Sequence, residues 1–78
     1  MSQPENKYLS LITHVAGKVK KVYSTTKREA ITEARRHTKT LPPGSRGEVM
    51  RHNGKGYVEC VYCVRTDARG KLVEEDIT

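Results

Sequence analysis

The fold is decided by residues 26–44, which read TKREAITEARRHTKTLPPG. Thr26 and Glu29 have the spacing of a capping box, in which the threonine hydroxyl accepts from the Glu29 amide and the Glu29 carboxylate reaches back to the Thr26 amide. A helix is therefore predicted to begin at Thr26. It should end before Leu41, because a residue that precedes proline avoids the helical region and the two following prolines cannot donate a backbone hydrogen bond.

At about 100° per residue, this helix has an apolar sector and a basic sector next to it. The apolar sector holds Ala30, Ile31, Ala34, His37, Thr38 and Leu41. The basic sector holds Arg28, Arg35, Arg36 and Lys39. Glu29 and Glu33 are expected on the far side, apart from the basic side chains. Because its apolar sector includes two small alanines, the helix is expected to lie close against a sheet.

A hairpin is predicted before the helix. Residues 8–15 alternate in the manner of a strand, and residues 18–23 form a second strand after a turn at Ala16-Gly17, where the glycine supplies positive φ. This second strand presents three lysines, Lys18, Lys20 and Lys21.

A second hairpin is predicted after the helix, with residues 47–52 and 57–65 as strands and Asn53-Gly54 as the turn signal. The strand 57–65 is expected at the centre of the sheet. Its alternation predicts an inward set and an outward set of side chains. The inward set is Val58, Cys60, Tyr62 and Val64, and the outward set is Tyr57, Glu59, Val61, Cys63 and Arg65. Residues 71–74 could add a short edge strand.

The order β-β-α-β-β predicts an α+β fold, an antiparallel sheet of four strands, or five with the edge strand, covered on one face by one helix. The 78 residues fit a single small domain and contain no Phe or Trp, so a thin core is expected. The predicted division is a flexible leader at residues 1–7, one domain at residues 8–74 and a short acidic tail at residues 75–78.

Positive charge is concentrated in the middle of the chain. The formal net charge is +6, and residues 18–55 contain 11 bases against 3 acids. Such a field attracts phosphates, acidic proteins or an anionic membrane surface. The predicted binding face consists of Lys18, Lys20, Lys21, Arg28, Arg35, Arg36, Lys39, Arg46, Arg51 and Lys55. DNA or RNA bound by these cations should be released as salt rises.

Two tyrosines are candidates for stacking on a nucleic-acid base. Tyr57 follows a Gly-Lys-Gly turn and is included in the predicted binding face, and Tyr23 closes the lysine-bearing strand. The alternative for both is a tyrosine that packs across neighbouring strands. Nothing in the sequence predicts sequence-specific base readout.

Cys60 and Cys63 form a C-x-x-C, a spacing found in zinc knuckles and redox pairs. The chain has no second such pair, and residues three apart on a strand point to opposite faces. One buried and one exposed reduced thiol are therefore expected, with no metal and no cofactor. The alternative is a zinc ion held with His14 or His52.

Catalysis finds little support in the sequence. The three histidines are isolated from one another, and His37 is expected to be partly buried beside the apolar sector of the helix. No nucleophile, base and acid fall into a recognisable arrangement, so the chain is predicted not to be an enzyme. No segment is apolar enough to span a bilayer and the polar start is not a signal peptide, so a cytoplasmic protein without a membrane partner is expected.

Gly47-Glu48-Val49-Met50-Arg51, preceded by the basic helix and followed by an Asn-Gly hairpin and a late Gly70-Lys71 turn, resembles small basic anti-CRISPR proteins of phages that act on type I-F surveillance complexes. The resemblance covers roughly residues 25–75. It implies that the basic face docks on the guide-RNA-bearing protein filament, in the path of the target DNA, and that no residue is catalytic.

Three functions follow as hypotheses. The first is direct binding of DNA or RNA, or of a nucleoprotein complex. The second is inhibition of a host defence complex by a protein of a phage or another mobile element. The third is a structural accessory that forms a homodimer through an exposed edge strand, instead of remaining a monomer.

Overall fold

The computed structural model describes residues 6–77 and has the predicted α+β architecture, with one helix packed on an antiparallel sheet. The elements are β1 (Tyr8–Thr13), β2 (Val19–Ser24), α1 (Lys27–Lys39), β3 (Arg46–His52), β4 (Tyr57–Thr66) and β5 (Leu72–Asp76). The sheet therefore has five strands, and the chain order is β-β-α-β-β-β.

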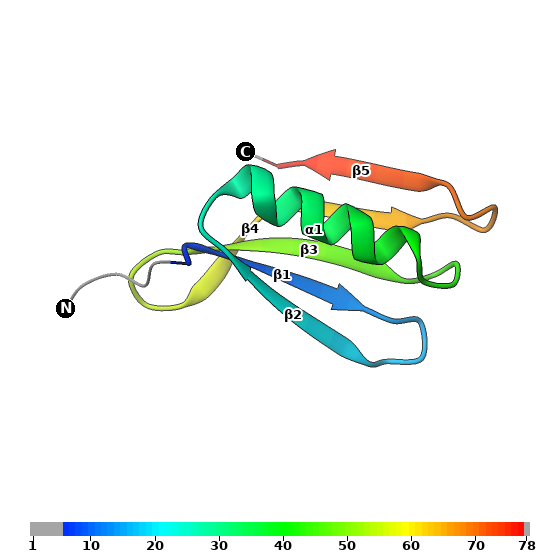
Figure 1. Cartoon of the computed structure of the whole chain (residues 1–78), viewed down its shortest axis with the longest axis horizontal. Helices are drawn as coiled ribbons and strands as arrows, with labels where there is room; N and C mark the ends of the chain where they lie inside the picture. Colours follow the sequence, from blue (N-terminus) through cyan, green and yellow to red (C-terminus); the bar gives the residue numbers. More distant parts are fainter. Residues whose placement is uncertain (1–5, 78) are drawn as a thin grey trace.

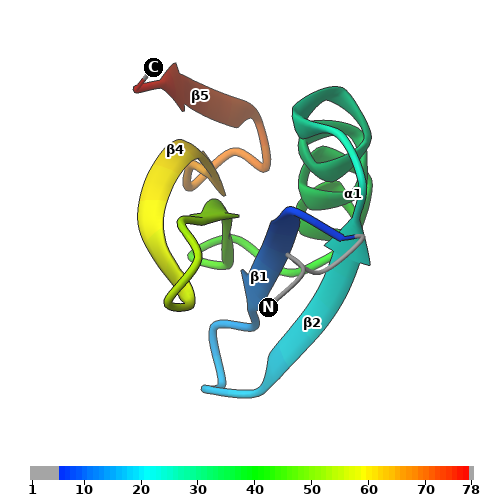
Figure 2. The ribbon, with the colours of Figure 1, turned by 90° about the vertical axis from the view of Figure 1, so that its left-hand side faces the viewer.

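The strands lie in the order β2-β1-β3-β4-β5, and α1 crosses one face of the sheet (Figures 1 and 2). The chain leaves edge strand β2, runs through α1 and returns as β3 on the other side of β1. The strand at the centre is consequently β3, and the expectation that the strand 57–65 would be central is wrong. The pattern of side chains along a strand indicates how far its faces are buried, but it does not indicate the position of that strand in the sheet. The crossover through α1 sets this position, because it brings the chain back as β3 on the far side of β1.

Local signals at both ends of α1 explain its bounds. The Glu29 amide donates to the Thr26 hydroxyl at 3.2 Å, as the capping box predicts. The Glu29 carboxylate differs from that prediction, because it accepts from the hydroxyls of Thr25 at 2.8 Å and Thr26 at 3.0 Å. After Lys39 the last turn tightens, with the Leu41 amide donating to the Thr38 carbonyl at 3.1 Å.

The core lies between α1 and the sheet. Ala30 and Ala34 are fully buried there, so the predicted apolar sector of the helix is confirmed. They pack against Val49, Val61, Tyr62 and Val64 of β3 and β4. The buried Ser10 hydroxyl of β1 donates to the Ala30 carbonyl at 2.7 Å, which ties the helix to the strand that it crosses.

The closest approach of helix and sheet is at Gly47 of β3. A Cβ at this position would lie 2.7 Å from the Thr38 hydroxyl oxygen, 3.2 Å from a Val64 methyl carbon and 3.3 Å from the Ala34 carbonyl oxygen. Thr38 is itself fully buried, and its hydroxyl oxygen has no hydrogen-bond partner among residues 6–77. Gly47 is therefore required because α1 occupies the space that a side chain would need.

Two irregularities in β4 change the faces that its side chains occupy. Val49 pairs with Tyr62 but the next residue, Met50, pairs with Cys60, so Val61 is an extra residue in a bulge. Val61 and Tyr62 are consequently both buried. A second shift near Tyr57 leaves Val58 65% exposed. The predicted inward position of Val58 and outward position of Val61 are wrong, since strict alternation assumes an unbroken ladder.

The bulge also changes the faces of the sheet on which the two cysteines lie. Cys60 pairs with Met50 and Cys63 pairs with Glu48, and these two β3 residues are two apart. Both thiols therefore lie on the sheet face opposite α1, and both are partly exposed. The expected division into one buried and one exposed thiol is wrong.

The ends of the domain differ from the predicted boundaries. Strand β5 continues to Asp76, so Glu75 and Asp76 belong to the sheet and not to a tail. At the other end, the Lys7 carbonyl accepts from the His52 amide at 2.8 Å, which ties residue 7 to β3. Residues 1–5 of the predicted leader and residue 78 of the predicted tail lie outside the described residues.

Replacing Gly47 with alanine should destabilise the protein by about 1–3 kcal/mol, because the new methyl group overpacks the helix–sheet contact. Urea unfolding followed by circular dichroism measures the loss. In a Thr38→Ala background, where the nearest clashing atom is absent, the same Gly47→Ala change should cost less. Equal costs in the two backgrounds would contradict the assigned contact.

Candidate nucleic-acid interface

The three predicted lysines lie at the exposed β2 edge, but they do not share one face. Lys20 pairs with Ile12, whose side chain is buried beneath α1, and so Lys20 lies on the helix side of the sheet. Lys21 pairs with Leu11 and lies on the opposite face. Lys18 belongs to the turn before β2. The lysines therefore surround the β2 edge.

The basic sector of α1 is divided by its ion pairs. The Arg35 Nε lies 3.0 Å from the Glu74 Oε1 of β5, and an Arg36 guanidinium nitrogen lies 2.6 Å from the Glu33 Oε2. Arg28 and Lys39 are exposed and form no ion pair within the described part of the chain. Two of the four predicted cations of the helix are thus already paired inside the molecule.

Glu33 corrects the predicted separation of acidic and basic side chains on the helix. Its Oε2 also lies 3.2 Å from the Nε2 of His37, a side chain that is largely buried, as expected. The hydrogen bond from Arg36, only partly opposed by burial, lowers the pKa of the Glu33 carboxyl. The expectation that this glutamate lies apart from the basic residues is wrong, because residues three and four apart on a helix are neighbours.

The cations predicted on β3 and its hairpin contribute less than expected. The Arg46 Nε lies 3.7 Å from the Glu48 Oε1, and an Arg51 nitrogen lies 2.5 Å from the Glu59 Oε1. Lys55 is exposed in the turn between β3 and β4. Arg46 and Arg51 therefore already have acidic partners.

The β5 side of α1 is covered by acidic side chains of the C-terminal strand. The Glu74 Oε1 accepts from Arg35 at 3.0 Å and also from the hydroxyl of buried Tyr62. The Lys27 Nζ lies 2.9 Å from the Asp76 Oδ1. These contacts neutralise α1 on its β5 side. The cations of α1 without an acidic partner in the described residues, Arg28 and Lys39, therefore lie toward β2 and on the outer surface of the helix.

Two shallow hollows follow the seam between β2 and α1. One, of about 360 Å³, is lined by Lys18 and Lys20 together with His37 near the end of the helix. The other, also about 360 Å³, is lined by Arg28 near the start of the helix, with Glu29 and Glu33 in its wall. The seam is therefore positive toward its two ends and acidic between them.

Tyr57 packs within the molecule. Its hydroxyl donates to the Asn6 carbonyl at 2.6 Å, and its ring meets those of Tyr23 and His52 edge to face, with centroids 5.6 Å and 4.9 Å away. These contacts favour the packing alternative for Tyr57. Tyr23 is 50% exposed and presents the more accessible ring.

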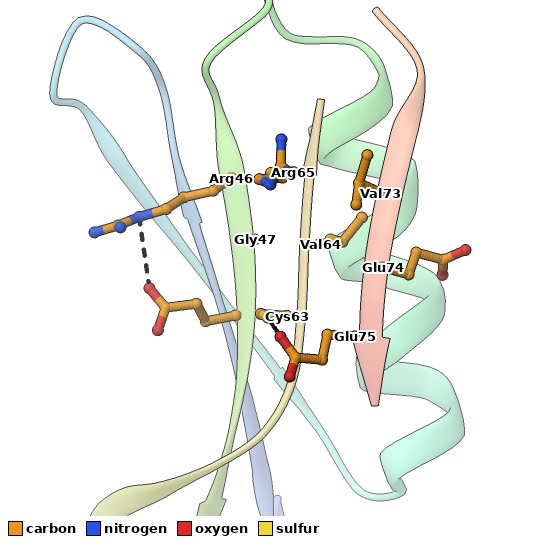
Figure 3. A pocket seen from close by; sticks show the side chains of 9 residues that line it. Arg46, Gly47, Cys63, Val64, Arg65, Val73, Glu74 and Glu75 are labelled. Atoms are coloured by element: carbon orange, nitrogen blue, oxygen red, sulfur yellow. Dashed lines mark hydrogen bonds and ion pairs between the residues drawn. The ribbon is translucent and has the colours of Figure 1, made fainter. Parts of the chain in front are cut away.

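A third hollow, of about 490 Å³, lies over β3, β4 and β5 and carries both signs of charge (Figure 3). Arg46 and Arg65 line it together with Glu75. Arg65 is an exposed cation outside the predicted binding face. Alternation in β4 indicated that it points outward, but only the register places it directly opposite Arg46.

The thiol in this hollow is poorly suited to nucleophilic chemistry. Burial raises the pKa of the Cys63 thiol, and the nearby Glu75 carboxylate, whose Oε2 lies 3.9 Å from the sulfur, raises it further (Figure 3). A raised pKa leaves less of the reactive thiolate at neutral pH.

Within residues 6–77, no three His, Cys, Asp or Glu side chains cluster closely enough to hold a metal ion. The helix in this described range is too short and too polar to cross a membrane. Comparison with known proteins found no matching family model, no matching curated protein and no matching solved structure.

Burial of Tyr62 and its contact with Glu74 should make the free energy of unfolding decrease at alkaline pH. Burial, and then the hydrogen bond to Glu74, raise the pKa of the Tyr62 hydroxyl on folding. Its contribution is therefore complete below the unfolded pKa of about 10 and is lost as the pH rises above that value.

Replacing Tyr62 with phenylalanine should cost about 1 kcal/mol at neutral pH. It should also flatten the loss of stability between pH values of about 10 and 12, as measured by urea unfolding. Tyr23→Phe, which alters an exposed side chain, is the control. If the wild type and Tyr62→Phe lost stability equally over this range, the assigned role of the contact would be wrong.

Proposed function

We propose that this protein is a non-enzymatic binding protein that engages nucleic acid, alone or within a nucleoprotein complex. One observation carries the proposal. After Arg35, Arg36, Arg46 and Arg51 are removed from the basic set because of their ion pairs, six exposed cations remain within the described residues. Lys55 lies in the β3–β4 turn, and the other five surround the β2 edge and the outer surface of α1. These five cations, here called the β2–α1 basic face, are Lys18, Lys20, Lys21, Arg28 and Lys39.

Lysine and arginine side chains of this kind bind phosphates and release the counterions that surround a nucleic acid. The exposed ring of Tyr23 lies on the sheet face opposite α1, as Lys21 does, and offers a surface on which a base could stack. The β2–α1 basic face has no arrangement of side chains that would enter a groove and read base edges, so the proposed binding is to backbone and exposed bases.

If all five cations contact phosphates, the logarithm of the binding constant should fall with the logarithm of salt concentration with a slope of roughly −3.5 for single strands or −4.5 for duplex. Fluorescence anisotropy with a labelled single strand and a labelled duplex, titrated at several salt concentrations, measures both slopes. Binding that is absent, or that does not change with salt, would contradict the proposal.

Neutralising Lys20 and Arg28 together, as Lys20→Gln and Arg28→Gln, should reduce the slope by roughly 1.4–1.8, since each lost phosphate contact removes about 0.7–0.9. The matched control neutralises Arg69 and Lys71 in and after the β4–β5 turn, outside the β2–α1 basic face. The control should keep the wild-type slope. An equal reduction of the slope in the two variants would indicate that binding depends only on net charge and not on the β2–α1 basic face.

A second candidate function is inhibition of a host defence complex through a protein surface, as the anti-CRISPR resemblance implies. The mixture of charges at Arg36–Glu33 and Arg46–Glu48 supports it, because a surface that meets protein needs complementary charges of both signs. A tagged protein used for pull-down from host lysate, with and without nuclease, separates the two functions. A stoichiometric complex that survives nuclease favours the protein target, whereas complete loss favours direct nucleic-acid binding.

A further inference from the structure

The two edges of the sheet carry opposite charges. Strand β2 has a single neighbour, β1, and presents the sequence Val19-Lys20-Lys21. Strand β5 also has a single neighbour, β4, and presents Val73-Glu74-Glu75. Each edge therefore leaves a row of backbone amide and carbonyl groups without partners in the sheet, which is a template for another strand.

The directions of the strands determine how a second copy of the chain can use these edges. Every neighbouring pair in the five-stranded sheet is antiparallel, so β2 and β5 point the same way, as their arrows show in Figure 1. A copy displaced sideways along the sheet brings its β5 parallel to β2, with both helices on the same side. The sheet would continue from one molecule to the next.

Corresponding residues of the two edge strands lie on the same faces of the sheet. Val19 and Lys21 lie on the face opposite α1, because they pair with Thr13 and Leu11. Val73 and Glu75 lie on the same face, because they pair with Arg65 and Cys63. Aligning the two valines therefore sets Glu75 beside Lys21 on that face.

The same alignment sets Glu74 beside Lys20 on the helix face, where Glu74 also contacts Arg35. Val19 is 55% exposed and Val73 is 39% exposed, so pairing would remove two apolar side chains from water.

We propose that this protein associates with a second copy of itself by adding the β5 edge of one molecule to the β2 edge of the next. The two symmetric alternatives are disfavoured, because β2 against β2 sets lysines beside lysines and β5 against β5 sets glutamates beside glutamates. The favoured contact joins two different surfaces, and each added molecule exposes the same pair of edges again. Such a contact builds open chains of molecules unless its rotation closes a ring.

Charge reversal at one residue of each edge tests the proposal. The Lys21 side chain has no hydrogen bond or ion pair within the described residues, and the Glu75 side chain has only its long contact with Cys63, so both tolerate substitution. Sedimentation velocity is measured over a range of micromolar concentrations, in low salt, with reductant and with nucleic acid removed. The wild type should associate as concentration rises and should dissociate as salt screens the pairs.

Lys21→Glu and Glu75→Lys should each weaken association about tenfold or more, since each sets like charges side by side. The double variant Lys21→Glu/Glu75→Lys should recover it, and so should an equimolar mixture of the two single variants. Lys55→Glu, which makes the same charge change in the β3–β4 turn, should associate like the wild type. Circular dichroism of every variant establishes that it is folded.

A wild type that stays monomeric at every concentration would overturn the proposal. Association that Lys21→Glu leaves unchanged, or that the double variant does not recover, would overturn it as well. Because nucleic acid is absent from these experiments, their result is independent of the proposed nucleic-acid binding.

Discussion

The packing of α1 on the sheet at Gly47 is the contact on which the rest of the structure depends. The helix lies so close to β3 that its Thr38 hydroxyl occupies the place of a side chain. Ala30 and Ala34 extend the same contact along the helix, with the Ser10 hydroxyl bonded to the Ala30 carbonyl. A chain without Phe or Trp builds its core by close approach of backbones in place of large side chains.

This packing also determines which cations of the described residues form internal ion pairs and which do not. With α1 fixed over β3, Arg35 faces Glu74 of β5, while the β2 side of the helix meets no acidic strand. Internal ion pairs therefore neutralise Arg35, Arg36, Arg46 and Arg51, and the β2–α1 basic face keeps its five cations without an acidic partner among the described residues. Exposed ion pairs of this kind contribute little to stability, roughly 0–1 kcal/mol each, so their main consequence is the arrangement of surface charge.

The bulge at Val61 gives the sheet two different faces. It buries Val61 and Tyr62 together beneath α1, and it brings Cys60 and Cys63 to the opposite face beside Met50 and Glu48. That face has no helix over it and combines half-exposed apolar residues with both signs of charge.

The sequence by itself determined the helix bounds, the two hairpins and the fold class, because capping residues, prolines and Asn-Gly turns act over a few neighbouring residues. It also indicated most of the exposed cations. Only the tertiary structure decided that β3 is central, that Val61 is inward and that Arg35 is paired with Glu74. Strand order, bulges and ion pairs such as Arg35–Glu74 join residues far apart in the chain, and their formation depends on how α1 packs. A local sequence pattern carries no information about contacts between residues far apart in the chain. Those contacts depend on how the elements pack.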